Sequence, residues 1–201
     1  MVLLWAIPIG LIIGLLRGGS ILNLEHIELK APWLILIALV IQFSIFPFGL
    51  PGGALLKLEG TLFEVVHLAS YALLALFVIF NIKEWMIGVM GLGMLANIVA
   101  ISSFGGMPVF RENLIASGRW TEAELAPYSC GDVLNNNVLI CEREGLWFLG
   151  DMFNTPIWFP LANVFSIGDI LLAIGMIIFI QAKMAHHRPS GAVEKEAASN
   201  E

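Results

Sequence analysis

Long apolar runs alternate with short polar segments along most of the chain, and each run has a length typical of a helix rather than a strand. The first run contains Gly10 and Gly14, a spacing that favours close packing against another helix. Two of the runs, the first and the second, are shorter than the ~20 residues of a perpendicular membrane span. The runs cover residues 2–16, 31–46, 62–81, 85–103 and 164–182.

Composition places these helices in a membrane. The chain is 58% hydrophobic and 13% charged, and its mean hydropathy is +0.86, all outside the usual range of soluble domains. The predicted fold class is therefore an all-α membrane protein, a bundle of about five transmembrane helices. Residues 1–183 form its single domain, with one long extracytoplasmic loop at 104–163. The polar tail, residues 184–201, is expected to be disordered in the cytoplasm.

Basic residues near the ends of the runs predict the orientation. One side of the membrane would hold six of them, whereas the short loop on the other side holds Lys57. Cytoplasmic loops carry the excess of Lys and Arg, so the N-terminus is predicted outside and the C-terminus in the cytoplasm of a cell-membrane protein. The six are Arg17, Lys30, Lys83, Lys183, Arg188 and Lys195.

The two cysteines, Cys130 and Cys141, both fall in the long loop. On the predicted topology that loop faces an oxidising exterior, which favours a disulfide between them. Two free thiols are an alternative, and a metal site is a weaker one because no nearby His completes it.

The rest of the loop has two further features. Residues 111–125 have the composition of a short helix, with Thr121 and Glu124 spaced as a capping box. Residues 145–160 are crowded with aromatic side chains, which suits a segment that lies at the lipid headgroups or folds back over the bundle.

The third run carries a polar stripe in its first half. On a helix, Glu64, His67, Ser70 and Tyr71 share one face, and ionisable groups in a membrane usually face the bundle interior. The predicted topology brings polar residues of the other helices to the same outer level, beneath the loop. The candidate ligand-binding residues are Gln42, Glu64, His67, Tyr71, Asn97, Asp151 and Asp169.

Function is less constrained than architecture. The sequence favours a non-enzymatic membrane component that binds a small molecule, a lipid or a partner protein at its outer face. A membrane enzyme or a transporter that uses Glu64, His67 and Asp169 is the alternative. Di-iron bundles need two Glu-x-x-His motifs and this chain has one, so no metal or other cofactor is assigned. No P-loop, dinucleotide fingerprint or nucleophile elbow is present, and no feature indicates a nucleic acid partner.

Four sequence blocks carry a family resemblance: LLRGG at 15–19, GGMPV at 105–109, LGD at 149–151 and PLANVFSIGDILLAIG at 160–175. They resemble an uncharacterised family of bacterial integral membrane proteins, catalogued as a domain of unknown function. The resemblance extends from residue 3 to about 182 and implies an inner-membrane protein with this five-span order, but no activity. The chain departs from the pattern in reading SSFGGMPV where an Asn usually precedes the glycines, and in its Cys-bounded loop.

Overall fold

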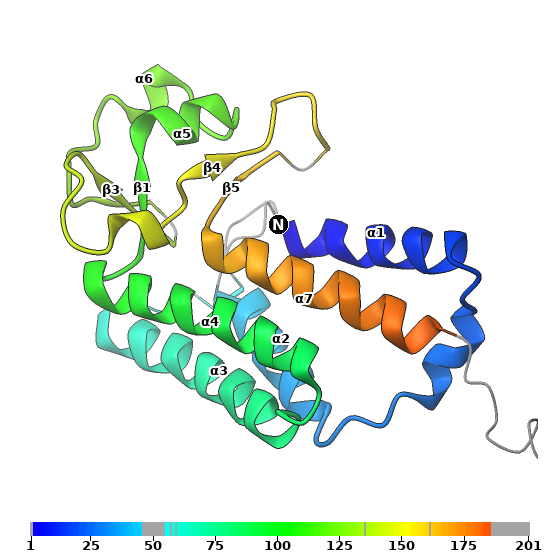
Figure 1. The fold of residues 1–201 in the computed structure, drawn as a ribbon. Coiled ribbons are helices and arrows are strands. Elements are labelled where there is room, and N and C mark those ends of the chain that lie inside the picture. The colour runs from blue at the N-terminus through cyan, green and yellow to red at the C-terminus, as the bar shows by residue number, and fades with distance from the viewer. Residues whose placement is uncertain are drawn as a thin grey trace, which may run out of the picture.

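A computed structural model describes residues 2–45, 55–56, 58, 60–134, 136–160 and 162–185. Within this part of the chain a helix occupies each of the five apolar runs (Figure 1). The predicted tail lies outside the described residues, apart from its first two positions at the end of the last helix. The five helices are α1 (Val2–Leu16), α2 (Trp33–Ile45), α3 (Gly60–Phe80), α4 (Trp85–Phe104) and α7 (Ile167–Met184).

Two of the described helices, α4 and α7, are long and apolar enough to cross a membrane by length and composition. The described parts of α1, α2 and α3 are also apolar but shorter. Between α1 and α2 the chain forms the 3₁₀ helix η1 (Ile21–His26), whose first turn is capped by the Ser20 hydroxyl.

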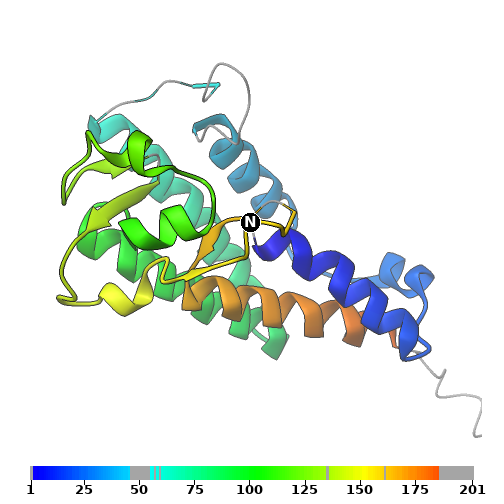
Figure 2. The same ribbon diagram turned by 90° about the horizontal axis from the view of Figure 1, so that it is seen from above.

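Helix α7 lies between α1 and α4, and glycines allow both close approaches (Figures 1 and 2). On the α1 side, a Cβ at Gly14 would meet the Sδ of Met184 at 2.6 Å. On the α4 side, Gly93 lies against the backbone of Gly168. Gly10 likewise faces Ile180, so the packing role predicted for the Gly10–Gly14 pair is confirmed.

Helices α2 and α3 pack against each other as a pair. They join the other helices through an apolar cluster close to the turn between α3 and α4. That cluster unites α2, α3, α4 and α7, and its buried members are Leu34, Phe77, Met86, Ile87 and Phe179.

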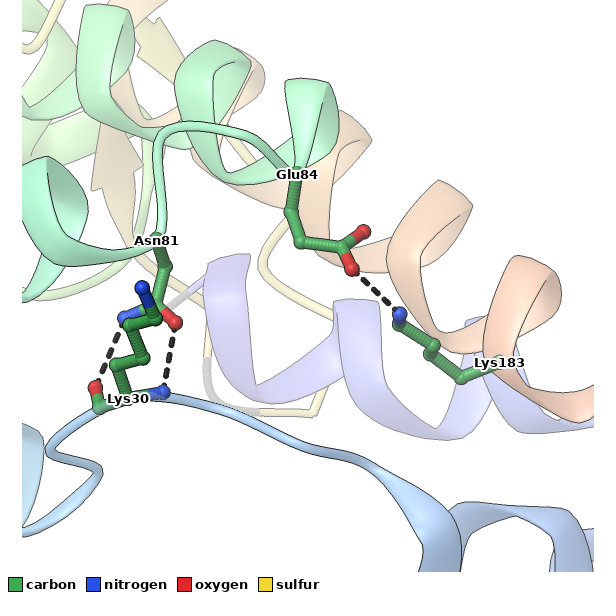
Figure 3. Close-up of polar contacts among 4 residues, drawn as sticks. All are labelled: Lys30, Asn81, Glu84 and Lys183. Carbon is green, nitrogen blue, oxygen red and sulfur yellow. Dashed lines mark hydrogen bonds and ion pairs between the residues drawn. The ribbon is translucent and has the colours of Figure 1, made fainter.

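The α3–α4 turn fixes two other segments through side chains (Figure 3). Buried Asn81 pairs with the backbone of Lys30: the Lys30 N–H donates to Oδ1 at 2.8 Å, and Nδ2 donates to the Lys30 carbonyl at 2.9 Å. Nearby, Lys183 of α7 forms an ion pair with Glu84 at 2.8 Å. We call this end of the helices the turn end, and the opposite end, where α4 ends and α7 begins, the cap end.

Residues 105–165 form a small unit, the cap, at the cap end (Figure 1). In its main sheet β3 lies between β1 and β2, parallel to β1 and antiparallel to β2, whereas β4 and β5 form a separate antiparallel pair. The elements are β1 (Met107–Phe110), α5 (Arg111–Ala116), α6 (Glu122–Leu125), β2 (Val133–Leu134), β3 (Asn137–Ile140), η2 (Trp147–Leu149), β4 (Phe153–Asn154) and β5 (Val164–Phe165). The cap has its own apolar core of Val109, Leu114, Leu125, Leu134, Leu139 and Val164.

The strands of the cap correct the prediction of an all-α chain. Residues 107–110 pair with 137–140 in parallel, and parallel pairing joins segments that are distant in sequence, so no local turn signal marks it. The short helix predicted within 111–125 is present as α5 and α6, and the capping box of Thr121 and Glu124 opens α6 as predicted.

The predicted disulfide between Cys130 and Cys141 is confirmed, and the alternative of two free thiols is wrong. The bond closes the segment that contains both strands of the β2–β3 hairpin. Because both cysteines are exposed, the bond links loop backbone at the surface of the cap rather than adding to its apolar core.

Candidate functional site

The first part of the site is a hydrogen-bonded network between α4 and the start of α7. Asn97 of α4 donates from Nδ2 to Oδ1 of Asp169 at 3.0 Å and accepts at Oδ1 from the Ser166 hydroxyl at 2.7 Å. Ser166 and Asp169 also form the capping box of α7, in which each side chain binds the backbone N–H of the other residue. The network therefore satisfies the first turn of α7 while fixing it to α4.

Two glycines make this contact sterically feasible. A Cβ at Gly168 would overlap the Asn97 side chain, and a Cβ at Gly93 would overlap the Gly168 carbonyl. The two backbones consequently approach closely enough for an amide on one helix to bind a carboxylate at the start of the other. The sequence block NVFSIGD contains the two capping-box residues, Ser166 and Asp169, and one of these glycines, Gly168.

The second part of the site is Asp151, a buried carboxylate of the cap. Its Oδ2 accepts from Asn137 Nδ2 at 2.7 Å, and its N–H donates to the Pro108 carbonyl at 2.8 Å. Its own carbonyl accepts from Asn113 Nδ2 at 3.2 Å. Asp151 thereby ties together β3, the β1 segment and α5, and the preceding Gly150 leaves no room for a side chain beside Pro108.

The electrostatics of Asp151 connect the cap to the helices. Burial, and secondly the negative charge of Asp169, raise the pKa of the Asp151 carboxyl from 3.8 to about 7. The hydrogen bond from Asn137 and the charge of Arg119 act in the opposite direction but do not offset the burial. Asp151 therefore changes its charge near neutral pH, in the presence of a second carboxylate.

Helix α3 contributes Tyr71, which lies close enough to Asp151 and Asp169 to interact electrostatically with both. The structure thus brings together four of the candidate residues, from α3, α4, the cap and α7: Tyr71, Asn97, Asp151 and Asp169. We call these four residues, with Asn137 and Ser166, the carboxylate cluster.

The other candidates form a chain of contacts along α2 and α3. Gln42 donates from Nε2 to the Ser70 hydroxyl at 3.2 Å, and that hydroxyl donates to the His67 carbonyl at 2.7 Å. The His67 ring lies against the Tyr71 ring, with centroids 5.1 Å apart. Contacts of the Glu64 side chain lie outside the described residues, so the predicted coupling of Glu64, His67 and Asp169 stays a prediction.

Two members of the carboxylate cluster are absent from the sequence-based candidate list. The sequence could have identified Ser166, because Ser-x-x-Asp directly before an apolar run is the pattern of a capping box. Asn137 has no such signal: it lies in a stretch of three asparagines, and only the parallel pairing of β3 with β1 places it beside Asp151.

Comparison with known proteins gives one match, to a protein family that covers residues 26–181, from η1 to the last turn of α7. The chain belongs to the DUF5317 family. DUF5317 is a family of unknown function, which agrees with the resemblance to an uncharacterised family but adds no activity. The matched range includes every residue of the DUF5317 carboxylate cluster described above. No curated protein and no solved structure matches the chain.

Proposed function

We propose that this DUF5317 protein is a multispan membrane protein in which α1, α2, α3, α4 and α7 all cross the bilayer. The support is the surface of the helices, where large apolar side chains are exposed instead of polar ones. Soluble proteins rarely expose contiguous apolar surface on this scale, whereas lipid requires it. Examples from each helix are Ile12, Leu36, Val65, Leu92 and Ile174, all more than a third exposed.

The cap is proposed to face the outside of the cell membrane. The disulfide lies in the cap, and Arg17, Lys30, Lys83 and Lys183 all lie toward the turn end, as expected of a cytoplasmic side. The test uses Ala123→Cys in α6 and Lys83→Cys in the α3–α4 turn, each exposed. In intact cells a membrane-impermeant maleimide should label the cysteine at 123 and spare the one at 83. The reverse pattern contradicts this orientation.

The biochemical role we propose is non-enzymatic binding of a cationic group at the cap end, from a small molecule or from a partner protein. The observation that carries it is the placement of Asp151 and Asp169, two carboxylates from the cap and from α7 that interact across their junction. Like charges held together in a place of low polarity favour a proton or another cation between them.

Binding is tested on purified protein in lipid nanodiscs at pH 8, with spermidine, choline and Ca²⁺ as probes. At least one probe should raise the melting temperature of the wild type and leave that of a combined Asp151→Asn and Asp169→Asn variant unchanged. Asp132→Asn, which removes an exposed carboxylate of the cap, is the matched control and should respond like the wild type. Equal responses of wild type and double variant, or no response to any probe together with an empty native mass spectrum, contradict the proposal.

A further inference from the structure

The segment of residues 155–160, which follows β4 in the cap, extends to helix α1. Both views place it beside the N-terminal part of α1 (Figures 1 and 2). Trp5 fixes it there: its Nε1 donates to the Pro160 carbonyl at 3.1 Å, and its ring lies 4.9 Å from that of Phe159 between centroids. We call residues 156–160, Pro-Ile-Trp-Phe-Pro, the aromatic turn.

The aromatic turn presents two of its side chains, Ile157 and Trp158, outward. Trp158 is 80% exposed and Ile157 is 69% exposed, although both are strongly apolar. The neighbouring surface of α1 is apolar as well, since Leu4 and Ile7 are also exposed. The turn therefore extends the apolar surface of the helices instead of covering it.

The chemistry of the turn suits a place with little water. Residues 152–163 contain no charged side chain. Pro156 and Pro160 have no N–H to satisfy, the Phe159 N–H donates to the Pro156 carbonyl at 2.9 Å, and the Pro160 carbonyl is taken by Trp5. Irregular backbone near hydrocarbon needs such partners, and these contacts supply them for the Phe159 N–H and for the carbonyls of Pro156 and Pro160.

The base of the turn is held in place by polar contacts on the cap side. Thr155 and Asn163 exchange hydrogen bonds across it, from the Thr155 N–H to the Asn163 carbonyl at 3.0 Å and from the Asn163 N–H to the Thr155 hydroxyl at 2.8 Å. Arg119 donates to Asn163 Oδ1 at 2.7 Å, which places a cation at the base of the turn. The exposed part of the turn is apolar, and its base carries a basic side chain and hydrogen-bonding groups. This order of polarity matches the change from acyl chains to headgroups.

We infer that the aromatic turn inserts Ile157 and Trp158 into the headgroup–acyl boundary of the outer leaflet and so anchors the cap to the lipid surface beside α1. The inference rests on the proposed membrane insertion of the helices. Its partner is the bilayer itself, because Trp is enriched at this boundary and the turn is continuous with the lipid-facing surface of α1.

The test is site-directed spin labelling in nanodiscs of phosphatidylcholine and phosphatidylglycerol, with the Cys130–Cys141 bond left intact. Nitroxides are placed by Trp158→Cys in the turn, Leu36→Cys on the exposed face of α2 and Ala123→Cys in α6, all at exposed positions. Power saturation then compares collisions with oxygen, which partitions into lipid, against those with a water-soluble nickel chelate. Labels at 158 and 36 should collide more with oxygen, and the label at 123 more with nickel.

The labels at 36 and 123 separate this inference from the proposal that the helices cross the membrane. If the label at 36 reports lipid and the label at 158 reports water, as at 123, the anchoring role is wrong while membrane insertion stands. If the label at 36 also reports water, the multispan proposal fails and the anchoring role fails with it. A repeat with Ile157→Cys guards against a local effect of removing Trp158 and should give the same result.

Discussion

The turn end and the cap end of the helices differ in how their polar side chains are paired. At the turn end every polar contact described joins complementary partners: Asn81 with the backbone of Lys30, and Glu84 with Lys183. At the cap end the negative charges of two carboxylates, Asp151 and Asp169, act on each other, and the hydrogen bonds they accept come from neutral side-chain amides and the Ser166 backbone N–H. The first arrangement stabilises the fold, whereas the second places like charges together, which is the basis of the proposed cation binding.

The largest effect is expected from breaking the turn end. Asn81→Ala removes both hydrogen bonds to the Lys30 backbone and leaves its part-buried N–H and carbonyl without these partners, which should lower the free energy of unfolding by about 2–4 kcal/mol. Reversible unfolding in mixed micelles measures this loss. Ser103→Ala is the matched control, because Ser103 also binds a backbone carbonyl but is exposed, and it should change stability by less than about 0.5 kcal/mol. Equal losses in the two variants would mean that the pairing with Lys30 does not hold this end.

At the cap end, Asp151→Asn is expected to raise the free energy of unfolding instead of lowering it. The pKa of this carboxyl is about 7 in the folded protein, above its ordinary value of 3.8, so folding favours its protonated form. Its contribution to stability is fully present below pH 4 and is lost as the pH rises to 7. Asp151→Asn should remove this loss and be more stable than the wild type at pH 8, by up to about 4 kcal/mol.

The measurement is the unfolding free energy of both proteins at several pH values from 4 to 8, with Asp132→Asn as an exposed-carboxylate control that should follow the wild type. Parallel curves for wild type and Asp151→Asn would show that burial does not shift this group. A variant less stable than the wild type at pH 8 would show that the hydrogen bond from Asn137 outweighs the burial of charge.

The smallest change is expected at the ion pair of the turn end. Glu84 and Lys183 are each about one-quarter to one-third exposed, and partly hydrated pairs contribute little. A double-mutant cycle with Glu84→Gln and Lys183→Met should give a coupling energy below about 1 kcal/mol, decreasing with added salt. A salt-independent coupling of several kcal/mol would place the pair in a drier environment than the structure indicates.

The sequence predicts the helices well and the cap poorly. Apolar runs fix the five helices to within a few residues, because hydrophobicity is read locally, and two cysteines in one polar loop were enough to predict their bond. The parallel pairing of β1 with β3 could not be read in the same way, since it depends on residues 30 positions apart.

The part of the candidate site on the helices could be predicted from the sequence, whereas the part in the cap could not. Asn97 and Asp169 were predicted to lie at one level, and the structure joins them directly, because helix geometry sets depth. The position of Asp151 depends on how the cap folds, so its burial beside Asn137 is visible only in three dimensions. The side chain of Glu64, one of the predicted site residues, lies outside the described part of the chain.

Infrared titration of protonated carboxyl groups tests the coupling between cap and helices most directly. The difference between the wild type and Asp151→Asn isolates the carbonyl band of Asp151, which should titrate near pH 7 because its pKa is raised to about 7. In an Asp169→Asn background the same band should titrate at a lower pH, since the neighbouring negative charge is gone. An unchanged midpoint in that background, or no Asp151 band at pH 5, would contradict the account of two interacting carboxylates at the cap end.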